Sequence, residues 1–573
     1  MPVTVGTAGH VDHGKTWLVR ALTGRDTDRL PEERRRGLSI DLGYAPLELE
    51  DGRRLSLIDV PGHERFVRNM VAGASGIDLF LLVVDAGEGP RAQTHEHLKI
   101  IGLLGIDRGV VAVTKADTVS DERRQQAVRE ARELVPRAEV VVVSAVTGLG
   151  LEGLRAAIGR AADSMTHGDL ELPTRLWIDR AFTIAGTGTV VTGTLWSGSV
   201  EVGETLRLEP AGRDVRIRAV EVHDAPVERA EAGQRVAVAL PGVARGDLRR
   251  GDALVAPGAY PVGYRLDVVL EGDGVPAAVT AHLGSASTSA RVVRSGNYAQ
   301  LRLSEAVVAS RGDRVVLRAE TTVGGAIVLD PAPPRRLDPK RLERLEGGDP
   351  VSIASELTHE PQTADSLRAR GVLAPAELEE GLRGLVHSDN WYFRPDWLEE
   401  LKASVRARLE GRLESGTLDP GLATSELLPK RDWTAAVLPL LDIELRNGKA
   451  YLAGTGPTLS GRAEEAARLT AELERAGPSG VEVTDAELVR YLERQGSLVR
   501  LGGGRAISVG AYDAARKALV AECTQTGSIR LARFRDLLGI SRKPAQLLLE
   551  RIDSDGVTRR QGEARVLRRR ARG

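Results

Sequence analysis

Eight residues near the start of the chain, GHVDHGKT (residues 9–16), have the types and spacing of a phosphate-binding loop. In the pattern Gly-x-x-x-x-Gly-Lys-Thr, the glycines allow backbone N–H groups to close around phosphate oxygens. Lys15 can reach the β- and γ-phosphates, and the hydroxyl of Thr16 can coordinate Mg²⁺. The alternative is a glycine turn that matches by chance. The flanks favour the loop, because PVTVGTA before it predicts a buried strand and KTWLVRALTG after it predicts a helix that stops at Gly24.

Three further segments follow predicted strands and could complete a guanine-nucleotide site. DVPGH (59–63) places Asp59 near Mg²⁺, as a ligand through water, and Gly62 near the γ-phosphate. In TKAD (114–117), Asp117 can accept hydrogen bonds from guanine N1 and N2, a donor pair that adenine lacks. In SAV (144–146), a backbone N–H can donate to guanine O6. The predicted site for GTP or GDP with Mg²⁺ therefore comprises Asp12, His13, Gly14, Lys15, Thr16, Asp59, Gly62, Thr114, Lys115, Asp117, Ser144, Ala145 and Val146.

The elements that must position these residues form an α/β domain. Continuous apolar strands alternate with helical segments across residues 1–168, which predicts a mostly parallel sheet with helices on both faces. Ligands of such sheets lie at the carboxyl ends of the strands. From about residue 172, short alternating strands separated by glycines predict two β-barrels, at 169–258 and 259–334. DPAPPRR (330–336) then predicts a stiff linker.

The C-terminal third predicts four tandem winged-helix modules. Helical segments end there in four hairpin-like stretches, HSDNWYFR, RNGKAYLA, RLGGGRAIS and RRQGEARVLR, whose turns are 59, 55 and 59 residues apart. Helices followed by a hairpin at a regular period indicate a repeated small α+β unit. We predict modules at 337–400, 401–455, 456–510 and 511–573.

Length and composition set the remaining bounds. At 573 residues the chain exceeds the size of one ordinary core, so several domains are expected. Its single cysteine, Cys523, excludes a disulfide framework and fits a reducing compartment. The start of the chain lacks a basic segment followed by an apolar one, and the longest apolar run (77–86) is too short to span a bilayer. We predict a monomeric cytoplasmic protein that does not bind membranes.

GHVDHGKT, DVPGH and TKAD resemble the GTPases of translation, the elongation factor Tu-like group. The resemblance implies ribosome-stimulated hydrolysis of GTP, in which His63 orients the attacking water and Val11 and Leu38 form an apolar gate. It further implies that RGLSI (36–40) is the first switch, with Ser39 binding Mg²⁺ where the group usually has Thr. Two other interpretations are open: the arginines at 34–36 could form a solvated basic loop, and the histidines at 10, 13 and 63 could bind a metal.

Thr114 is a second departure from the group, which usually has Asn at this position of the guanine motif. That Asn mainly braces the loop, and the hydroxyl of Thr114 could do the same.

RLPEERRRGLSIDLGY (29–44) is similar to the bacterial selenocysteine-specific elongation factors (SelB). That family carries an Asp-Arg pair at the opening of its second domain and an Arg inside AGQR, here Asp179, Arg180 and Arg235. The resemblance implies a pocket for the selenocysteinyl group. A selenol is ionised at neutral pH whereas a Cys thiol, with a pKa of about 8.5, is mostly neutral. Two guanidinium groups, oriented by Asp179, would select the anion; alternatively, both arginines are ordinary surface residues of the barrel.

The end of the chain carries the nucleic-acid signal. Residues 534–573 hold eleven Lys or Arg against five acidic residues, in a chain whose net charge is −1. Such localised positive charge is typical of phosphate binding, and few aromatic residues accompany it, which favours an RNA hairpin recognised by shape. A solvated basic tail is the alternative. The predicted RNA-binding residues are Arg542 and Lys543 at the start of a recognition helix, and Arg559, Arg560, Arg568 and Arg569 in a basic wing.

Together these features predict a GTP-dependent elongation factor. It would bind selenocysteinyl-tRNA and an mRNA hairpin (SECIS) and deliver selenocysteine at a recoded UGA codon on the ribosome. A general elongation factor Tu-like or initiation-type GTPase shares the first three domains but has no place for the tail. A sulfate-assimilation GTPase shares the motifs and barrels, and a GTP-gated regulator could use winged helices on DNA.

Overall fold

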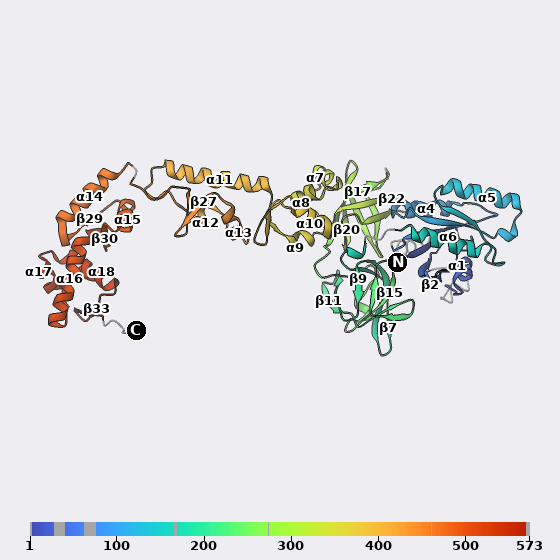
Figure 1. Ribbon diagram of the computed structural model, residues 1–573, viewed down its shortest axis with the longest axis horizontal. Helices are drawn as coiled ribbons and strands as arrows, with labels where there is room; N and C mark the ends of the chain where they lie inside the picture. Colours follow the sequence, from blue (N-terminus) through green and yellow to red (C-terminus); the bar gives the residue numbers. More distant parts are fainter. Residues whose placement is uncertain are drawn as a thin grey trace. The chain divides into compact units, whose positions relative to one another are not determined.

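The computed structural model describes residues 3–27, 41–61, 76–165, 169–272, 274–459 and 461–568 (Figure 1). The chain divides into two compact units, Met1–Arg394 and Pro395–Gly573. No helix in these described ranges has both the length and the apolar character needed to cross a membrane.

The first domain is a six-stranded sheet in the order β2-β3-β1-β4-β5-β6, and every pairing is parallel except that of β2 with β3. Successive residues of β4 point to opposite faces. Leu81 packs with α1 and α6 on one face, and Leu82 packs with α4 and α5 on the other. The predicted helix-covered sheet is therefore confirmed. Its elements are β1 (Thr4–Ala8), α1 (Lys15–Thr23), β2 (Gly43–Glu48), β3 (Arg54–Asp59), β4 (Leu79–Asp85), α4 (Ala92–Leu103), β5 (Gly109–Thr114), α5 (Asp121–Leu134), β6 (Glu139–Val142) and α6 (Leu151–Asp163).

Two β domains follow. The first is an eight-stranded sheet in the order β11-β10-β16-β7-β8-β15-β12-β13, with the ribbon β14-β9 beside it, and its apolar side chains form one core. The second is a closed barrel in the order β17-β20-β19-β18-β21-β22. The strands are β7 (Arg175–Ile184), β8 (Gly188–Ser197), β9 (Ser199–Glu201), β10 (Thr205–Glu209), β11 (Arg213–Arg216), β12 (Ala219–Val222), β13 (Ala225–Val227), β14 (Arg229–Glu231), β15 (Arg235–Leu240), β16 (Ala253–Val255), β17 (Val262–Glu271), β18 (Ala278–Leu283), β19 (Ala286–Ser295), β20 (Tyr298–Val308), β21 (Arg314–Arg318) and β22 (Thr322–Asp330).

A buried ion pair joins the two β domains. Both Nη atoms of Arg175 lie 2.7 Å from the carboxylate oxygens of Asp313, and the two side chains are 4% and 5% exposed. The rings of Trp177, Trp196 and Tyr260 surround the guanidinium. Breaking such a pair leaves an uncompensated buried charge, so it favours one arrangement of the two domains.

The first winged-helix module packs directly on the closed barrel. Leu329 of β22 shares an apolar cluster with Leu342 and Leu345 of the module, and Arg341 pairs with Asp330. The segment 330–336, predicted to be a stiff linker, therefore connects two domains that contact each other directly. The module consists of α7 (Pro339–Glu346), α8 (Pro350–Leu357), β23 (Gln362–Thr363), α9 (Ala364–Arg368), α10 (Pro375–Leu382), β24 (Val386–Ser388) and β25 (Trp391–Phe393).

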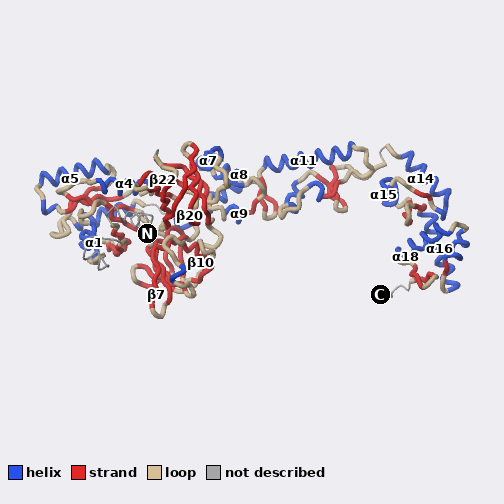
Figure 2. Tube along the Cα trace, turned by 180° about the vertical axis from the view of Figure 1, so that it is seen from behind, coloured by secondary structure: helices blue, strands red, loops and turns tan. Residues whose placement is uncertain are grey.

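The unit Pro395–Gly573 contains three more small sheets, each accompanied by helices (Figure 2). In all four modules the last strand lies between the other two, as in β23-β25-β24 and β32-β34-β33. The predicted borders at 400/401 and 510/511 fall inside α11 and α16, since these two helices begin directly after the preceding hairpins. The elements are α11 (Pro395–Glu414), β26 (Leu422–Ala423), α12 (Thr424–Leu427), α13 (Thr434–Val437), β27 (Ile443–Arg446), β28 (Lys449–Leu452), α14 (Ala463–Ala476), β29 (Val481–Glu482), α15 (Ala486–Arg494), β30 (Leu498–Leu501), β31 (Arg505–Ser508), α16 (Val509–Thr526), β32 (Ile529–Arg530), α17 (Leu531–Leu538), α18 (Arg542–Ser554), β33 (Thr558–Gln561) and β34 (Ala564–Leu567).

Candidate functional site

The phosphate loop connects β1 to α1 at the carboxyl end of the sheet. Asp12 and Gly14 have positive φ angles of 65° and 86°, which curl the backbone before the helix begins. The Nζ atom of Lys15 donates to the carbonyl oxygens of Gly9 (3.0 Å) and His10 (2.7 Å), so the ammonium lies across the loop. Burial lowers the pKa of Lys15 to about 8, and the charges of Asp59 and Asp12 oppose that effect. An anionic phosphate would stabilise its charged form further.

Asp59, the last residue of β3, lies within a cluster of hydroxyl groups. Its Oδ2 accepts from Thr16 (2.8 Å) and Thr27 (2.9 Å), and its Oδ1 accepts from Thr7 (3.1 Å). Burial raises the pKa of Asp59, while Thr16 and Lys15 act in the opposite direction. Carboxylate and hydroxyl oxygens are the ligands that Mg²⁺ prefers, so the donor set fits this ion. The third predicted ligand, Ser39, lies outside the described residues, as do Gly62, His63 and Leu38.

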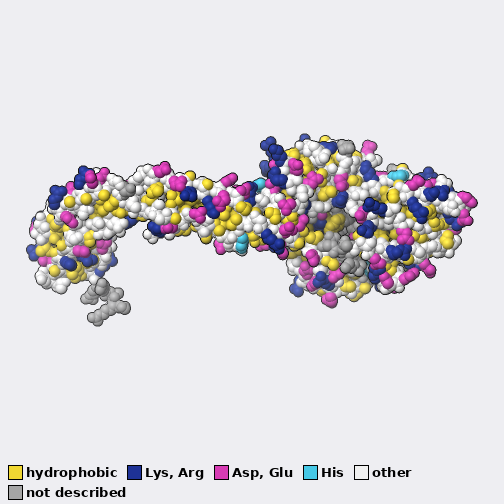
Figure 3. Space-filling model, turned by 45° about the horizontal axis from the view of Figure 1, so that its top comes forward, with side chains coloured by type: hydrophobic (Ala, Val, Ile, Leu, Met, Phe, Trp, Pro, Cys, Tyr) yellow, Lys and Arg dark blue, Asp and Glu magenta, His cyan; other side chains and the backbone are white. Residues whose placement is uncertain are grey.

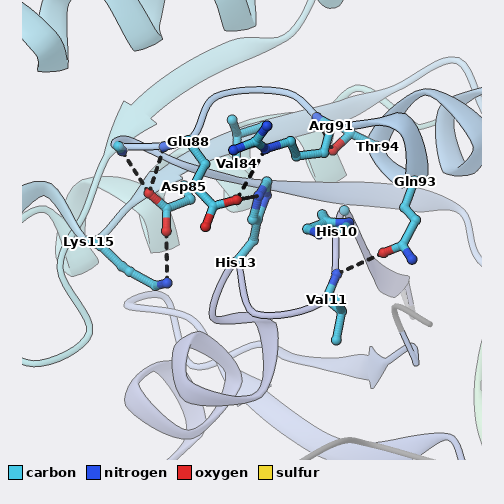
Figure 4. Close-up of polar contacts among 12 residues, drawn as sticks. His10, Val11, His13, Val84, Asp85, Glu88, Arg91, Gln93, Thr94 and Lys115 are labelled. Atoms are coloured by element: carbon cyan, nitrogen blue, oxygen red, sulfur yellow. Dashed lines mark hydrogen bonds and ion pairs between the residues drawn. The ribbon is translucent and has the colours of Figure 1, made fainter.

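The guanine motif is braced against the phosphate loop. The Thr114 hydroxyl at the end of β5 donates to the carbonyl oxygen of His13 at 2.7 Å, which is the bracing expected of a hydroxyl at this position. The next residue, Lys115, has a φ of 54° and pairs with Asp85 at 2.7 Å (Figure 4). This turn carries Asp117 outward on a short 3₁₀ helix, Ala116–Thr118, where the carboxylate is exposed.

The segment after β6 lies beside the guanine motif. The backbone N–H of Ala116 donates to the carbonyl of Val143 at 3.2 Å, which ties the two loops together. Ser144 is buried and its Oγ accepts from the N–H of Thr147 at 3.2 Å, whereas Val146 is 81% exposed. The structure therefore brings all the described members of the predicted nucleotide site to one edge of the sheet.

One histidine of the phosphate loop, His13, lies in the protein interior. His13 is fully buried, its Nδ1 lies 3.4 Å from the carbonyl oxygen of Val83, and its Nε2 lies 3.7 Å from Glu88 Oε2 (Figure 4). Burial lowers the pKa of His13 to about 4, so its ring is neutral at physiological pH. Within the described ranges, no three His, Cys, Asp or Glu side chains are placed to hold a metal ion.

Asp179 and Arg235 of the predicted selenocysteinyl pocket form a largely buried ion pair. Both Nη groups of Arg235 reach the Asp179 carboxylate, and its Nη2 also donates to Thr192 at 3.1 Å. The hydroxyl of Thr192 donates in turn to Asp179 at 2.9 Å. The expected orienting role of Asp179 toward Arg235 therefore has a geometric basis.

Arg180 projects toward the nucleotide domain. Its Nη2 donates to Asp41 Oδ2 and to the carbonyl of Leu42, each at 2.7 Å. The ring of Tyr44 lies between the two arginines, 3.3 Å from the Arg235 guanidinium carbon and 5.4 Å from that of Arg180. Burial raises the pKa of Tyr44, so the ring remains an uncharged phenol.

Sequence reasoning therefore missed three residues of this cluster, Asp41, Tyr44 and Thr192. Asp41 and Tyr44 belong to the segment whose sequence suggested the family, but nothing in their spacing indicated a contact with the second domain. Beside them a cavity of about 440 Å³ opens between the two domains. Its apolar wall includes Phe182 and Ile184, and its polar wall includes Arg180 and Arg235.

The last winged-helix module presents part of the predicted RNA-binding set. Arg542 and Lys543 are exposed at the start of α18, and Arg568 is exposed after β34. Arg559 and Arg560 are also exposed, but consecutive strand residues point to opposite faces. Arg560 pairs across the hairpin with Arg565, which is buried against Asp553 of α18. The two arginines thus occupy different faces, and Arg569 lies outside the described residues.

Four family models match this chain. The elongation factor Tu GTP binding domain matches residues 2–164, and elongation factor Tu domain 2 matches 188–255. The beta-barrel domain of selenocysteine-specific elongation factor matches 276–335, and the winged helix of elongation factor SelB matches 522–567.

Individual proteins show the same similarity. The selenocysteine-specific elongation factor of Escherichia coli (strain K12) is 34% identical over 629 residues, which cover 98% of both chains. That of Desulfomicrobium baculatum is 48% identical over 262 residues, which cover 45% of this chain and 41% of its own. The crystal structure of a bacterial selenocysteine-specific elongation factor, EF-Sec, matches 99% of this chain and 100% of its own with a TM-score of 0.73 and 28% identity.

Proposed function

Because the chain belongs to the selenocysteine-specific elongation factor family, we propose that it carries selenocysteinyl-tRNA to the ribosome, tethered by an mRNA hairpin (SECIS) at a recoded UGA codon. It is a translation elongation factor, and its elongation factor Tu-type GTP binding domain hydrolyses GTP. The cargo, the hairpin and the codon are the proposed part.

The observation that carries the cargo proposal is the cluster of Arg180, Arg235 and Asp179. A guanidinium has five N–H donors. Within the described residues, the hydrogen bonds above use two donors of Arg180 and three of Arg235. Donors therefore remain on both arginines for an anion in the adjoining cavity. A selenolate would accept them, whereas a neutral thiol or hydroxyl would gain less, since charge-assisted hydrogen bonds are roughly twice as strong as neutral ones.

Asp41 and Tyr44 suggest how this pocket would respond to the nucleotide. Asp41 directly follows the segment predicted as the first switch, Tyr44 lies three residues further on, and both contact the pocket arginines. A nucleotide-dependent movement of that segment would therefore change which N–H groups of Arg180 and Arg235 face the cargo. In hydrolysis we assign His63 to the attacking water; Thr16, Ser39 and Asp59 (the last through water) would hold Mg²⁺, which would neutralise phosphate charge.

A row of arginines on the closed barrel is suited to the tRNA backbone. Arg265, Arg302 and Arg291 are cross-strand partners on the neighbouring strands β17, β20 and β19. Like charges directly opposite one another destabilise a sheet, and none of the three forms an ion pair within the described ranges. Arg291 and Arg302 also border a hollow of about 540 Å³ with Arg318. The described lining of this hollow holds three arginines and no Asp or Glu, whereas Lys and Arg are interspersed with Asp and Glu over much of the surface visible in Figure 3.

For the mRNA hairpin we propose the exposed cations Arg542, Lys543, Arg559, Arg560 and Arg568 of the last module, with Arg569. Three other basic residues of this region are less available, because Arg535, Arg551 and Arg565 each pair with an aspartate.

A reconstituted translation reaction tests the whole proposal. With this protein, GTP, ribosomes and selenocysteinyl-tRNA, a message with UGA followed by the hairpin should yield full-length product. The same message with the hairpin deleted should terminate at UGA. Equal readthrough of both messages would favour a general elongation factor, and tighter binding of duplex DNA than of the hairpin at matched salt would favour a DNA-binding regulator.

A further inference from the structure

Helix α4 lies against the phosphate loop and offers it two hydrogen-bond acceptors. Oε1 of Gln93 accepts from the backbone N–H of Val11 at 3.1 Å (Figure 4). Nδ1 of His97 accepts from the backbone N–H of Gly9 at 3.0 Å. Gln93 and His97 are four residues apart, so they share one face of the helix. The nucleotide-site motifs used in the sequence analysis include neither residue.

The acceptor role of His97 fixes its protonation state. A ring nitrogen that accepts a hydrogen bond carries no proton, so the proton of the neutral ring is on Nε2. Within the described residues that buried Nε2 has no hydrogen-bond partner, so this tautomer satisfies the N–H of Gly9 at the cost of leaving its own N–H unpaired. The side chain is 1% exposed, and burial, followed by the charge of Lys15, lowers its pKa to about 3. His97 therefore remains an acceptor throughout the physiological pH range.

The loop depends on these acceptors because its backbone is constrained. Gly9 has a φ of 128°, and a Cβ at this position would lie 2.2 Å from the carbonyl oxygen of Val83. Its N–H is buried beneath α4, where a donor without a partner is costly. Lys15 donates to the carbonyl oxygens of Gly9, which is held by His97, and of His10, which lies between the two held residues, so the loop backbone also positions the lysine.

Other residues of α4 contact the closed barrel. Lys99 donates to the carbonyl oxygen of Thr322 on the closed barrel at 2.8 Å, and Glu96 pairs with Arg318 at 3.7 Å. Helix α4 therefore contacts both the phosphate loop and the closed barrel.

We propose that Gln93 and His97 are positioning residues of the GTPase, which hold the N–H groups of Val11 and Gly9 so that the loop and Lys15 are preorganised for phosphate. The inference rests on guanine-nucleotide binding by the first domain and not on the proposed delivery of selenocysteine. Val11 is also the residue expected to gate the attacking water, so Gln93 acts on the reaction through it.

Equilibrium binding of a fluorescent GDP analogue to the full-length protein tests this role. His97→Leu replaces the ring with an apolar side chain of similar size that has no acceptor, and should weaken binding about 5- to 100-fold. His97→Asn keeps an acceptor atom the same number of bonds from Cα, and should stay within about threefold of wild type. Gln93→Met, at a half-buried position, should weaken binding roughly 2- to 10-fold.

Two variants serve as matched controls. His95→Leu makes the same change at an exposed position of α4, and Gln125→Met does so at an exposed position of α5; both should bind like wild type. The unfolding midpoint of each nucleotide-free variant is measured in parallel, to separate misfolding from misplaced donors.

The ranking of the His97 variants decides the outcome. Recovery of GDP affinity by His97→Asn, with loss in His97→Leu at a similar unfolding midpoint, supports a positioning role. Equal loss in both variants would show that the ring's shape matters and would overturn the proposal, as would wild-type affinity in His97→Leu. A wild-type protein that binds no GDP would refute the nucleotide site itself, independently of this pair.

Discussion

Neutralising Arg235 should separate its contribution to stability from its contribution to selectivity. The side chains of Arg235 and Asp179 are only 13% and 9% exposed and pair through two N–H groups. In Arg235→Gln, Asp179 would be left as a buried carboxylate without its cation. Loss of one partner of a buried pair costs about 3–5 kcal/mol, so the urea midpoint of the first unit should fall clearly.

The double variant Arg235→Gln/Asp179→Asn removes both charges together. Replacement of a whole buried ion pair by neutral groups is often nearly neutral for stability, so most of the lost midpoint should return. Selectivity should not return, because the cation that favours a selenolate is still absent. One or two charge-assisted hydrogen bonds of about 1.5–3 kcal/mol each correspond to a loss of roughly 10- to 10⁴-fold in preference for selenocysteinyl-tRNA.

The assay compares the two variants with wild type by urea unfolding and by competition between selenocysteinyl- and seryl-tRNA in the presence of GTP. A double variant that is stable and still prefers the selenocysteinyl form would refute the selectivity argument. A single variant as stable as wild type would instead show that Asp179 does not need Arg235 in the folded chain.

Three shorter predictions address other parts of the molecule. Thr114→Val should weaken GDP binding about 5- to 30-fold, since the buried carbonyl of His13 loses its donor, and Thr114→Asn should restore it; equal binding by all three proteins would contradict the bracing role. Burial raises the pKa of Asp267 to about 6, so the stability present below about pH 4 is lost as pH rises to 6. Asp267→Asn should therefore raise the free energy of unfolding by about 1–3 kcal/mol at pH 7.5 and not at pH 4, and an equal gain at both values would refute this. Arg542→Ala and Lys543→Ala should each weaken hairpin RNA binding and lower the slope of log affinity against log salt by about 0.7–1, whereas an unchanged slope would remove that residue from the phosphate contacts.

The nucleotide site was predictable because its chemistry is local in sequence. A glycine-rich loop and three strand ends are each short segments, and a parallel sheet must bring its strand ends to one edge. For Thr114 the sequence predicted only a hydroxyl that braces the loop, and in the structure this hydroxyl donates to the carbonyl oxygen of His13. The winged-helix repeat was also predictable, because each hairpin turn is a short local signal. Two predicted borders fall inside α11 and α16, since the sequence marks the turn of a hairpin but not the point after it where the next long helix begins.

Contacts between domains were not predictable from spacing. Tyr44 reaches Arg235 across 191 positions, and Arg175 reaches Asp313 across 138. No periodic pattern links such residues, since their meeting depends on how whole domains pack. The docking of the first winged-helix module was missed for the same reason. Prolines at 331, 333 and 334 predicted a stiff linker, but they gave no sign that Leu329, Leu342 and Leu345 bury one another.

The most direct test of the central claim is the rate at which the ester bond of aminoacyl-tRNA hydrolyses with this protein and GTP. The same tRNA is charged with selenocysteine, cysteine or serine, and each form is compared with and without the protein. Binding of the anionic cargo by Arg180 and Arg235 predicts protection of the selenocysteinyl ester alone. Equal protection of all three esters, or of none, would contradict it.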